Sequence, residues 1–359
     1  MAQKVVVVGA GILGAQAAYR MQSAGADVTV IDKRGPGGVA TAASFGWINA
    51  SFYLDDHHFA LRRSGMAAWQ RLIHEVDLPV QRCGALSWEH QGPALDAECA
   101  SLSAKGYAVE VVGSGTIRSL VPSLGNPPDR ALWFADEMAA ESEQVAARLL
   151  QLAVSKGARL LTGAAVTGVS QQAGTVTGVQ TEAGAIAADE VLLCTGTQSG
   201  PLLAPLGIEV PMARRPALML RTRPVAQCLG PVLVTPAGEI RQLPDGSILM
   251  PAAIGHQGAS DETLTGTPED AERDGLARLR ALFPDLTLEI AGMMLAQRPY
   301  PADGLPVVGS VAKGVTLAVM HSGITLGALM GELLCGEILD GPSNVSSDLL
   351  APYRPDRFQ

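Results

Sequence analysis

The sequence predicts an α/β fold in which a Rossmann-like nucleotide-binding domain carries a second, mixed α+β domain with an antiparallel sheet. Three observations support this prediction. A run of β-branched residues leads into a Gly-x-Gly-x-x-Gly motif at the start of the chain. A strand, a glycine turn and a helix follow one another again near its end. Between them, the pattern changes to a mixed region over residues 81–140 and to short strands with turn signals over residues 212–295.

The N-terminal segment has the order of elements that a dinucleotide site requires. Residues 4–8 (KVVVV) have the composition of a buried parallel strand, residues 15–24 that of a helix, and residues 27–31 that of a second strand. The motif Gly9-Ala10-Gly11-Ile12-Leu13-Gly14 joins the first strand to the helix, and Asp32 follows the second strand. Because these five features occur together, a dinucleotide site is favoured over an ordinary glycine-rich turn.

Each residue type in this motif has a physical role. Gly9 permits a tight turn, Gly11 lets a pyrophosphate approach the backbone, and Gly14 lets the helix pack closely on the strand. The helix N-terminus offers N–H donors and a partial positive charge to phosphate groups. Asp32 is expected to accept hydrogen bonds from a ribose diol. The motif therefore predicts where the adenosine and pyrophosphate of a dinucleotide bind.

Composition narrows the class of protein. The 359 residues include 26 basic and 35 acidic side chains, and the net charge of −9 disfavours binding to nucleic acid or anionic membranes. The five cysteines are scattered without metal-ligand spacing, which favours reduced thiols in a cytoplasmic protein and no metal site. We recognise no signal peptide, and no apolar run approaches the length of a transmembrane helix.

The rest of the chain is predicted as alternating short elements. A loop of small and polar residues over 33–54 suits a position against a ligand. Helices are expected over 55–76, 93–105, 114–121, 143–156, 268–282 and 328–339. Strands are expected over 85–88, 107–112, 131–134, 159–161, 165–170, 175–181, 190–194, 217–221, 239–242, 247–250, 288–295 and 315–320. Residues 297–309 are expected to form a Pro/Gly loop that runs into a strand, and residues 321–327 a glycine turn.

Three stretches resemble the D-amino-acid-oxidase-like family of FAD-dependent oxidoreductases, and within it the glycine/sarcosine oxidase group. They are the N-terminal VVVVGAGILGAQAAYRMQSAGADVTVID, the segment LLCTGTQSGPLL near residues 192–203, and QRPYPADGLPVVG followed by LAVMHSGITLGALMGELL. Their order and spacing span nearly the whole chain. The resemblance implies an FAD-binding domain assembled from residues 1–80, 141–211 and 296–359, and a substrate domain made of residues 81–140 and 212–295.

The resemblance also implies which residues contact FAD. The expected contacts are Gly9, Gly11, Ile12, Leu13, Gly14, Asp32, Lys33, Thr41, Ala42, Ala43, Ser44, Val166, Thr195, Gly196, His321, Gly323, Ile324, Thr325 and Leu326. Val166 would act through its backbone or be only a buried strand valine. His321 would lie near the flavin ring or have a structural role at its turn. Some relatives attach flavin to a cysteine near the C-terminal motif, but residues 291–320 contain none, so noncovalent FAD is expected.

Arg298 is the residue expected to bind the substrate and to be catalytic. In the resembled family an arginine at this place holds the substrate carboxylate. A planar guanidinium suits this role because it can donate two parallel hydrogen bonds to a carboxylate. The alternative is a surface arginine that pairs with Asp303.

Three further residues are candidates for the substrate pocket. Trp47 and Tyr300 are expected either to line it or to serve only in packing. Arg241 is a candidate for a second polar contact. It lies on a predicted hairpin where many relatives have a tyrosine motif and where this chain has Glu-Ile-Arg-Gln at residues 239–242.

These features predict oxidation of the C–N bond of a small amino acid, with glycine or an N-substituted glycine as the leading substrate class. Arg298 would orient the substrate so that hydride passes from Cα to FAD; the imine then hydrolyses and O2 is reduced to H2O2. Two alternatives stay open: a D-amino-acid or 2-hydroxy-acid dehydrogenase that uses another electron acceptor, and a non-catalytic flavoprotein subunit. The oligomeric state is also left open.

Overall fold

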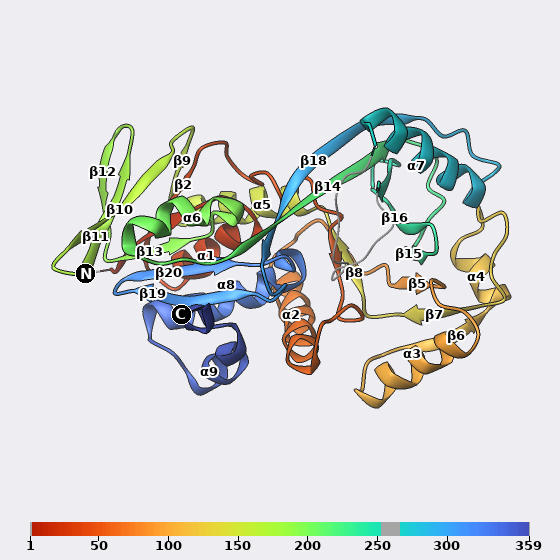
Figure 1. Cartoon of the computed structure of the whole chain (residues 1–359), viewed down its shortest axis with the longest axis horizontal. Coiled ribbons are helices and arrows are strands. Elements are labelled where there is room, and N and C mark those ends of the chain that lie inside the picture. The colour runs from red at the N-terminus through yellow and green to blue at the C-terminus, as the bar shows by residue number, and fades with distance from the viewer. Residues whose placement is uncertain (1, 253–265, 359) are drawn as a thin grey trace.

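The computed structural model describes residues 2–252 and 266–358, which form two lobes linked by a long pair of antiparallel strands (Figure 1). These strands are β14 (Met212–Thr222) and β18 (Ile290–Pro301). Both ends of the described chain lie in the lobe that contains the N-terminal strand (Figure 1). Because β14 and β18 extend from one lobe to the other, they carry side chains into the region between the lobes.

A six-stranded sheet forms the centre of the first lobe. Its strands β20, β13, β1, β2 and β9 are parallel, and β19 is antiparallel to β20. Parallel strands are covered on both faces, which accounts for the four consecutive valines of β1. In spatial order the strands are β19 (Val307–Ala312), β20 (Val315–Val319), β13 (Glu190–Leu193), β1 (Lys4–Val8), β2 (Asp27–Asp32) and β9 (Arg159–Thr162).

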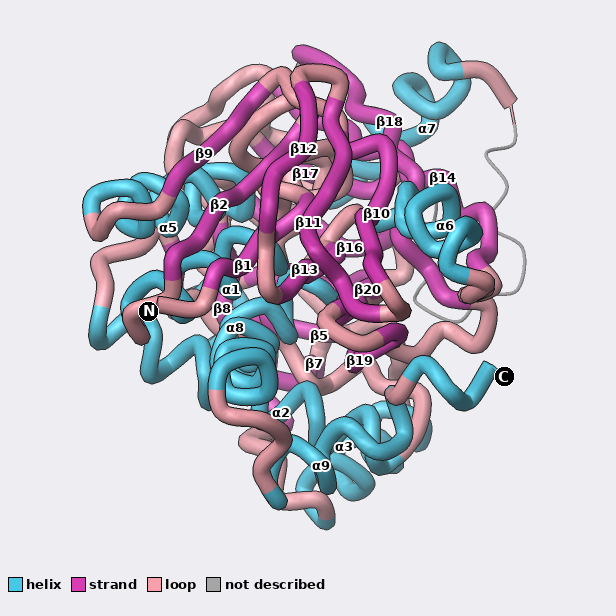
Figure 2. The backbone as a smooth tube through the Cα atoms, turned by 90° about the vertical axis from the view of Figure 1, so that its left-hand side faces the viewer, coloured by secondary structure: helices cyan, strands magenta, loops and turns pink. Residues whose placement is uncertain are grey.

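Different elements cover the two faces of this sheet. Val5 and Val7 point into a core that they share with helices, whereas Val6 and Val8 point into a core that they share with a three-stranded antiparallel sheet. Figure 2 shows this small sheet beside the six-stranded sheet, away from α5 and α8. The helices are α1 (Ile12–Ser23), α5 (Ser142–Ser155) and α8 (Gly323–Leu339), with α2 (Asp56–Glu75) packed on α8, and the small sheet consists of β10 (Val166–Gln172), β11 (Thr175–Thr181) and β12 (Gly184–Ala187).

An eight-stranded sheet forms the second lobe. In spatial order its strands are β18, β14, β17 (Ile248–Pro251), β16 (Gly238–Gln242), β15 (Val232–Thr235), β5 (Ala85–Ser87), β7 (Arg130–Phe134) and β6 (Glu110–Gly113). One face packs its apolar side chains, such as Ile240 and Met250, against α4 (Ser114–Leu120) and α7 (Pro268–Leu282). The opposite face carries Met219 and Leu249, which pack against Phe45 of the first lobe. This second face therefore points toward the nucleotide motif.

Small elements complete the chain. The strands β3 (Trp47–Ile48), β8 (Met138–Ala140) and β4 (Val80–Gln81) form a short antiparallel sheet. The remaining α-helices of the described chain are α3 (Pro93–Ala104), α6 (Ser199–Leu203) and α9 (Asn344–Leu350). Through β3 and β8, the predicted loop over residues 33–54 is attached to the segment that follows β7.

Most of the predicted elements are present, and the exceptions have physical reasons. The prediction of a loop at residues 297–301 is wrong, because these residues are the end of β18. Pro299 and Pro301 fit there since β18 is the outermost strand of its sheet, where a missing N–H need not interrupt a ladder. The last long helix begins at Gly323 rather than at residue 328. The strands β3, β4, β8, β12 and β15 were not predicted, and β3 lies within the predicted loop over residues 33–54. The small side chains of β8 and β12 give a weak strand signal.

The predicted domain segments can be compared with the sheets that they form. The six strands of the first sheet come from residues 1–80, 141–211 and 296–359, and most of the eight-stranded sheet comes from residues 81–140 and 212–295. The strand β18 crosses the predicted boundary at residue 296. The division into two domains stays a prediction, with the sheets as its structural basis.

Gly14→Ala is expected to destabilise the protein, because an added Cβ would lie 1.9 Å from the carbonyl oxygen of Gly9. The helix α1 would have to move away from β1, and we expect a loss of more than about 2 kcal/mol in the free energy of unfolding, measured by chemical denaturation. The matched control is Gly336→Ala in α8, where a Cβ would meet nothing within 4 Å. This control should be neutral or stabilising by up to about 1 kcal/mol, and equal stabilities of the two variants would contradict the packing argument.

Candidate active site

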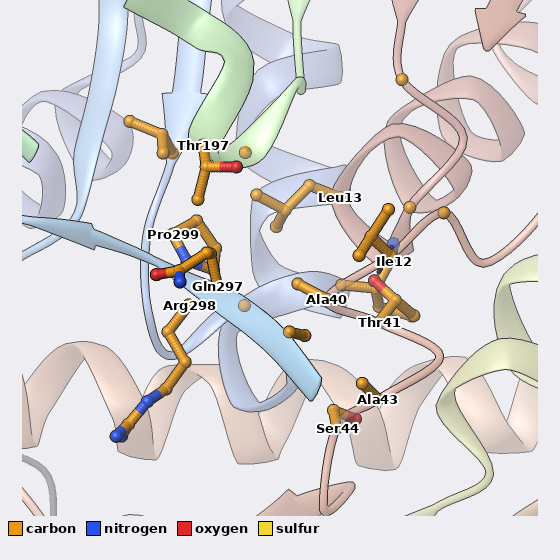
Figure 3. Close-up of a pocket in the computed structure, with 18 of the residues that line it drawn as sticks. Ile12, Leu13, Ala40, Thr41, Ala43, Ser44, Thr197, Gln297, Arg298 and Pro299 are labelled. Carbon is orange, nitrogen blue, oxygen red and sulfur yellow. Dashed lines mark hydrogen bonds between the residues drawn. The ribbon is translucent and has the colours of Figure 1, made fainter. Parts of the chain in front are cut away.

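A cavity of about 1060 Å³ lies between the two lobes. Its wall includes residues at the carboxyl ends of β1, β13 and β20, where ligands bind in open α/β sheets. Figure 3 shows Ile12 and Leu13 of α1 on one side and Gln297, Arg298 and Pro299 of β18 opposite. The loop residues Ala40, Thr41, Ala43 and Ser44 lie beside α1. Pockets that hold drug-sized ligands measure about 300–1,000 Å³, so this cavity has room for a dinucleotide together with a small second molecule.

The glycine motif has the close approaches expected of a dinucleotide site. Gly9 has a φ of 107°, and a Cβ there would lie 2.4 Å from the carbonyl oxygen of Cys194. Gly11 lines the cavity, and a Cβ there would approach the hydroxyl of Thr41 to 3.2 Å. The same hydroxyl accepts a hydrogen bond of 3.0 Å from the N–H of Ile12. The loop is thereby attached to the first turn of α1, whose remaining N–H groups are available to an anion.

Asp32 lies on the cavity wall at the end of β2, as the motif predicts. One of its carboxylate oxygens accepts a hydrogen bond of 2.8 Å from the N–H of Ala10, and the other accepts bonds from Arg34 and Gly35. Three backbone donors therefore fix this carboxylate beside the glycine turn. The ordering of its two oxygens favours the predicted contact with a ribose, which remains a proposal.

The loop of residues 41–49 is held against the start of α8. Thr325 donates to the carbonyl of Trp47 at 3.3 Å and accepts from the N–H of Asn49 at 3.4 Å. Arg62 of α2 donates to the backbone carbonyl of Asn49 at 3.1 Å and to its side-chain oxygen at 2.7 Å, and it reaches Ser322 at 2.8 Å. Arg62 lines the cavity and is buried, and burial lowers its pKa to about 10, so it stays cationic at neutral pH. The cavity thus has a positive charge near the start of α8.

A buried carboxylate positions Trp47. Glu137 is fully buried and accepts hydrogen bonds from the indole of Trp47 at 2.8 Å, from Ser51 at 2.7 Å and from Tyr107 at 2.7 Å. Burial raises the pKa of Glu137 to about 7, although these three donors favour its charged form. Trp47 lines the cavity as predicted, and Glu137 determines how its ring is oriented.

Arg298 projects from β18 on the cavity wall, away from Ile12 and Leu13 (Figure 3). Its Nη1 lies 3.4 Å from Nε2 of His321. Burial, together with the positive charges of Arg298 and Arg62, lowers the pKa of His321 to about 3, so this imidazole is neutral and its Nε2 can accept from Arg298. Nδ1 of His321 is then a buried N–H, and it has no hydrogen-bond partner among the residues that the structure describes.

Most of the predicted contacts line one continuous cavity. They are Gly9, Gly11, Ile12, Leu13, Asp32, Lys33, Thr41, Ala43, Ser44, Trp47, Val166, Thr195, Gly196, Arg298, His321, Gly323, Ile324 and Thr325. Five candidates do not line it: Gly14, Ala42, Arg241, Tyr300 and Leu326. Gly14 instead serves the close packing of α1 on β1, and Leu326 is buried in the core.

Arg241 and Tyr300 lie close to the cavity without lining it. Arg241 is buried and forms an ion pair of 3.0 Å with Glu141. Its guanidinium carbon lies 5.9 Å from the centre of the Phe45 ring, and Phe45 does line the cavity. The ring of Tyr300 lies 5.3 Å from that of His321. Both residues therefore support the wall, and the structure gives no basis for direct contact with substrate.

Several residues of the wall were not among the candidates, notably Arg62, Asn49 and Glu239. A signal for Arg62 exists in the sequence, since it occurs at helical spacing between Phe59 and Met66 on the apolar face of α2. A charged residue on such a face needs polar partners or a function. Glu239 lies on the same strand as Arg241, and the alternation of β16 puts both on the face that points toward the first lobe.

The described residues contain neither a metal-ligand cluster nor a helix suited to cross a membrane. No group of three or more His, Cys, Asp or Glu side chains among them is placed to hold a metal ion. No helix in residues 2–252 and 266–358 is long and apolar enough to cross a membrane. All five cysteines are free thiols.

The fold and the cavity are those of an α/β protein that binds a dinucleotide. A model of the DAO family, whose description is FAD dependent oxidoreductase, matches residues 4–336. The chain is 28% identical to the uncharacterized oxidoreductase YurR of Bacillus subtilis over 98% of both chains. It is 28% identical to the glycine oxidase of Pseudomonas aeruginosa over 99% of both. The crystal structure of iminodiacetate oxidase from Chelativorans sp. BNC1 is similar with a TM-score of 0.82 and 26% identity, covering 98% of both chains. The protein therefore belongs to the DAO family of FAD-dependent oxidoreductases.

The residues of the cavity fit FAD, the cofactor of this family. A Cβ on Gly11 would narrow the cavity wall, and the N-terminus of α1 lies at this wall, where its N–H groups suit the phosphates of FAD. On the cavity wall at β18 and the start of α8, the buried Nδ1–H of His321 is a donor to which a ligand can supply an acceptor. Cys194 lines the cavity, but burial raises the pKa of its thiol to about 12, so it is a poor nucleophile. This supports the prediction that FAD is bound noncovalently.

Glu137 should make the stability of the protein depend on pH. Its pKa in the folded state is about 7, above its ordinary value of 4.5, so the stability that its protonated form contributes is lost as the pH rises through 7. The free energy of unfolding of the wild type, minus that of Glu137→Gln, should fall by on the order of 1–3 kcal/mol between pH 5 and pH 8. Denaturant titrations at each pH measure it. Glu110→Gln on the exposed side of β6 is the control, and a pH-independent difference for Glu137→Gln would be inconsistent with the burial argument.

Proposed function

We propose that the protein is an FAD-dependent oxidase of a small amino acid, with glycine or an N-substituted glycine as substrate. The observation that carries the proposal is the position of Arg298 on the wall of a cavity that also contains the nucleotide motif. The similarity to a glycine oxidase and to an iminodiacetate oxidase supports the same substrate class, since iminodiacetate is a glycine with a carboxymethyl group on nitrogen.

Arg298 would bind the substrate carboxylate through two parallel hydrogen bonds and so fix the direction of the Cα–H bond. His321 would accept from the same guanidinium and limit its rotation, because its neutral Nε2 lies 3.4 Å from Nη1. FAD, when bound, supplies the hydride acceptor and the means of reducing O2 to H2O2. Hydride transfer requires a neutral amine, so a substrate that binds as an ammonium ion first loses a proton to the solvent, and the product imine hydrolyses in water.

The residues that would hold FAD follow from the wall of the cavity. The glycine turn and α1 would hold its pyrophosphate, and Asp32 its ribose. The loop with Thr41 and the start of α8 would contact the rest of the cofactor. Apolar side chains such as Leu13, Phe45 and Met219 would exclude water from the space between FAD and Arg298.

The purified protein is expected to be yellow and to produce H2O2 from glycine, sarcosine or iminodiacetate. Precipitation with acid should leave the flavin in the supernatant, because it is held noncovalently. Absorption spectra and a peroxidase-coupled assay measure both results, with lactate and D-amino acids as comparison substrates. A protein whose flavin is bleached anaerobically by none of these compounds would contradict the catalytic proposal.

Arg298→Ala is expected to lower kcat/KM for a carboxylate substrate by roughly 30- to 1,000-fold, because one partner of a charge pair is removed. The flavin spectrum and the melting temperature should stay close to those of the wild type. Arg214→Ala is the matched control, since Arg214 is exposed one position away from the register partner of Arg298. Its activity should be unchanged. Similar kcat/KM values for Arg298→Ala and the wild type would remove Arg298 from its assigned role.

A further inference from the structure

Glu239 of β16 lines the cavity, and no part of the proposed reaction has used it so far. The carboxylates in the described lining of the cavity are Asp32 and Glu239. Asp32 is engaged by three backbone N–H groups at the nucleotide end. Glu239 is the cavity-lining carboxylate of the second lobe, on the same sheet as Arg298.

Strand registers place Glu239 and Arg298 on the same face of the eight-stranded sheet. Arg241 of β16 and Arg221 of β14 are both paired with Leu249 of β17, so these three side chains share one face. Alternation along β16 and β14 adds Glu239 and Arg215 to that face.

The pairing of β14 with β18 places Arg298 on the same face. Arg215 is paired directly with Arg298 across β14 and β18. The face that carries Glu239, Arg215 and Arg298 is the one whose Met219 and Leu249 pack against Phe45. Glu239 and Arg298 therefore both point into the space between the lobes, from different strands.

Charges of both signs lie on this face, namely the carboxylate of Glu239 and the guanidinium groups of Arg215 and Arg298. Burial and the neighbouring Arg215 lower the pKa of Arg298, and Tyr300 and Glu239 oppose this shift, so the carboxylate of Glu239 interacts electrostatically with the guanidinium of Arg298. Two cationic side chains opposite one another in a sheet repel each other. A ligand with a carboxylate at the arginine side and a cationic amine at the glutamate side matches this arrangement of charges.

We propose that Glu239 determines substrate specificity by accepting a hydrogen bond from the amine of the substrate, while Arg298 holds the carboxylate. The proposal rests on the proposed amino-acid oxidase function and deepens it. It makes the ligand class an amino acid with a free or alkylated cationic nitrogen, and it excludes 2-hydroxy acids as good ligands. A hydroxyl in place of the ammonium group forms no ion pair with Glu239 and leaves the charge of this half-buried carboxylate less well compensated.

The competing explanation is that Glu239 only offsets the positive charges of Arg215 and Arg298. The two explanations predict different affinities for pairs of carboxylate ligands that have the same shape but differ in having an amine. If Glu239 only offsets charge, Glu239→Gln should tighten the binding of every carboxylate, with or without an amine. If it contacts the amine, Glu239→Gln should weaken amines selectively.

The experiment uses the holoenzyme and two matched ligand pairs. Glycine is compared with glycolate, and iminodiacetate with diglycolate, in which oxygen replaces the nitrogen. Dissociation constants come from anaerobic titration of the flavin spectrum or, for ligands that reduce it, from the concentration dependence of the reduction rate. Glu239→Gln is expected to bind the amines about ten- to a hundredfold more weakly and the oxygen analogues within about threefold of the wild type. Glu239→Asp, which keeps the charge, should restore part of the preference.

The control variant changes a carboxylate that is not part of the cavity wall. Glu289→Gln, at an exposed carboxylate paired with Arg223, should bind all four ligands as the wild type does. An equal change for both members of each pair in Glu239→Gln would overturn the inference. A wild-type flavin that binds glycine in preference to glycolate, yet is reduced by no amine, would overturn the proposed oxidase function and leave the role of Glu239 supported by the binding constants.

Discussion

The contact between Gly9 and Gly14 is the constraint on which the rest of the site depends. The helix α1 lies so close to β1 that a Cβ on Gly14 would be 1.9 Å from the carbonyl oxygen of Gly9. Because this contact fixes α1, it fixes the direction of the N–H groups that face the cavity. One of them, on Ile12, is bonded to Thr41, so the loop over residues 41–49 takes its position from the same helix. The nucleotide end of the cavity and part of the wall beyond it thus follow from one backbone contact.

Buried polar contacts, and not apolar packing alone, define the rest of that wall. The loop is bonded to Thr325 at the start of α8, to Arg62 on α2 and, through Trp47, to Glu137 after β7. Burying Arg62 and Glu137 is costly, and the cost is offset only when all of their hydrogen bonds are made. A network of this kind favours one arrangement of the loop over near alternatives, which suits a wall that must hold Arg298 and a substrate in register.

The sequence was sufficient to predict the structural elements that depend on residues close together in the chain. The strand, glycine turn, helix and Asp32 of the first lobe are confirmed because each depends on residues close together in the chain. The end of β18 was not predicted, since two prolines are compatible with a strand only when it lies at a sheet edge, and sheet order is not visible in a sequence. For the same reason the sequence analysis named Arg241, and not Glu239, as a candidate for contact with the substrate. Which of two residues on a shared face reaches a cavity depends on the opposite lobe, here on Phe45 above Arg241.

Specificity in this site therefore has a different origin from cofactor binding. A guanidinium such as Arg298 recognises any carboxylate, whether an amino or a hydroxyl group stands on the neighbouring carbon. The glycine turn recognises the phosphates and leaves the second molecule unspecified. We propose that an amine is distinguished from an alcohol by an acceptor with a negative charge on the same wall as the arginine. The eight-stranded sheet provides this because β16 and β18 are separated by β17 and β14 yet present Glu239 and Arg298 on one face. The order and register of the strands in that sheet, rather than a motif in the chain, place the two charges on one wall of the cavity.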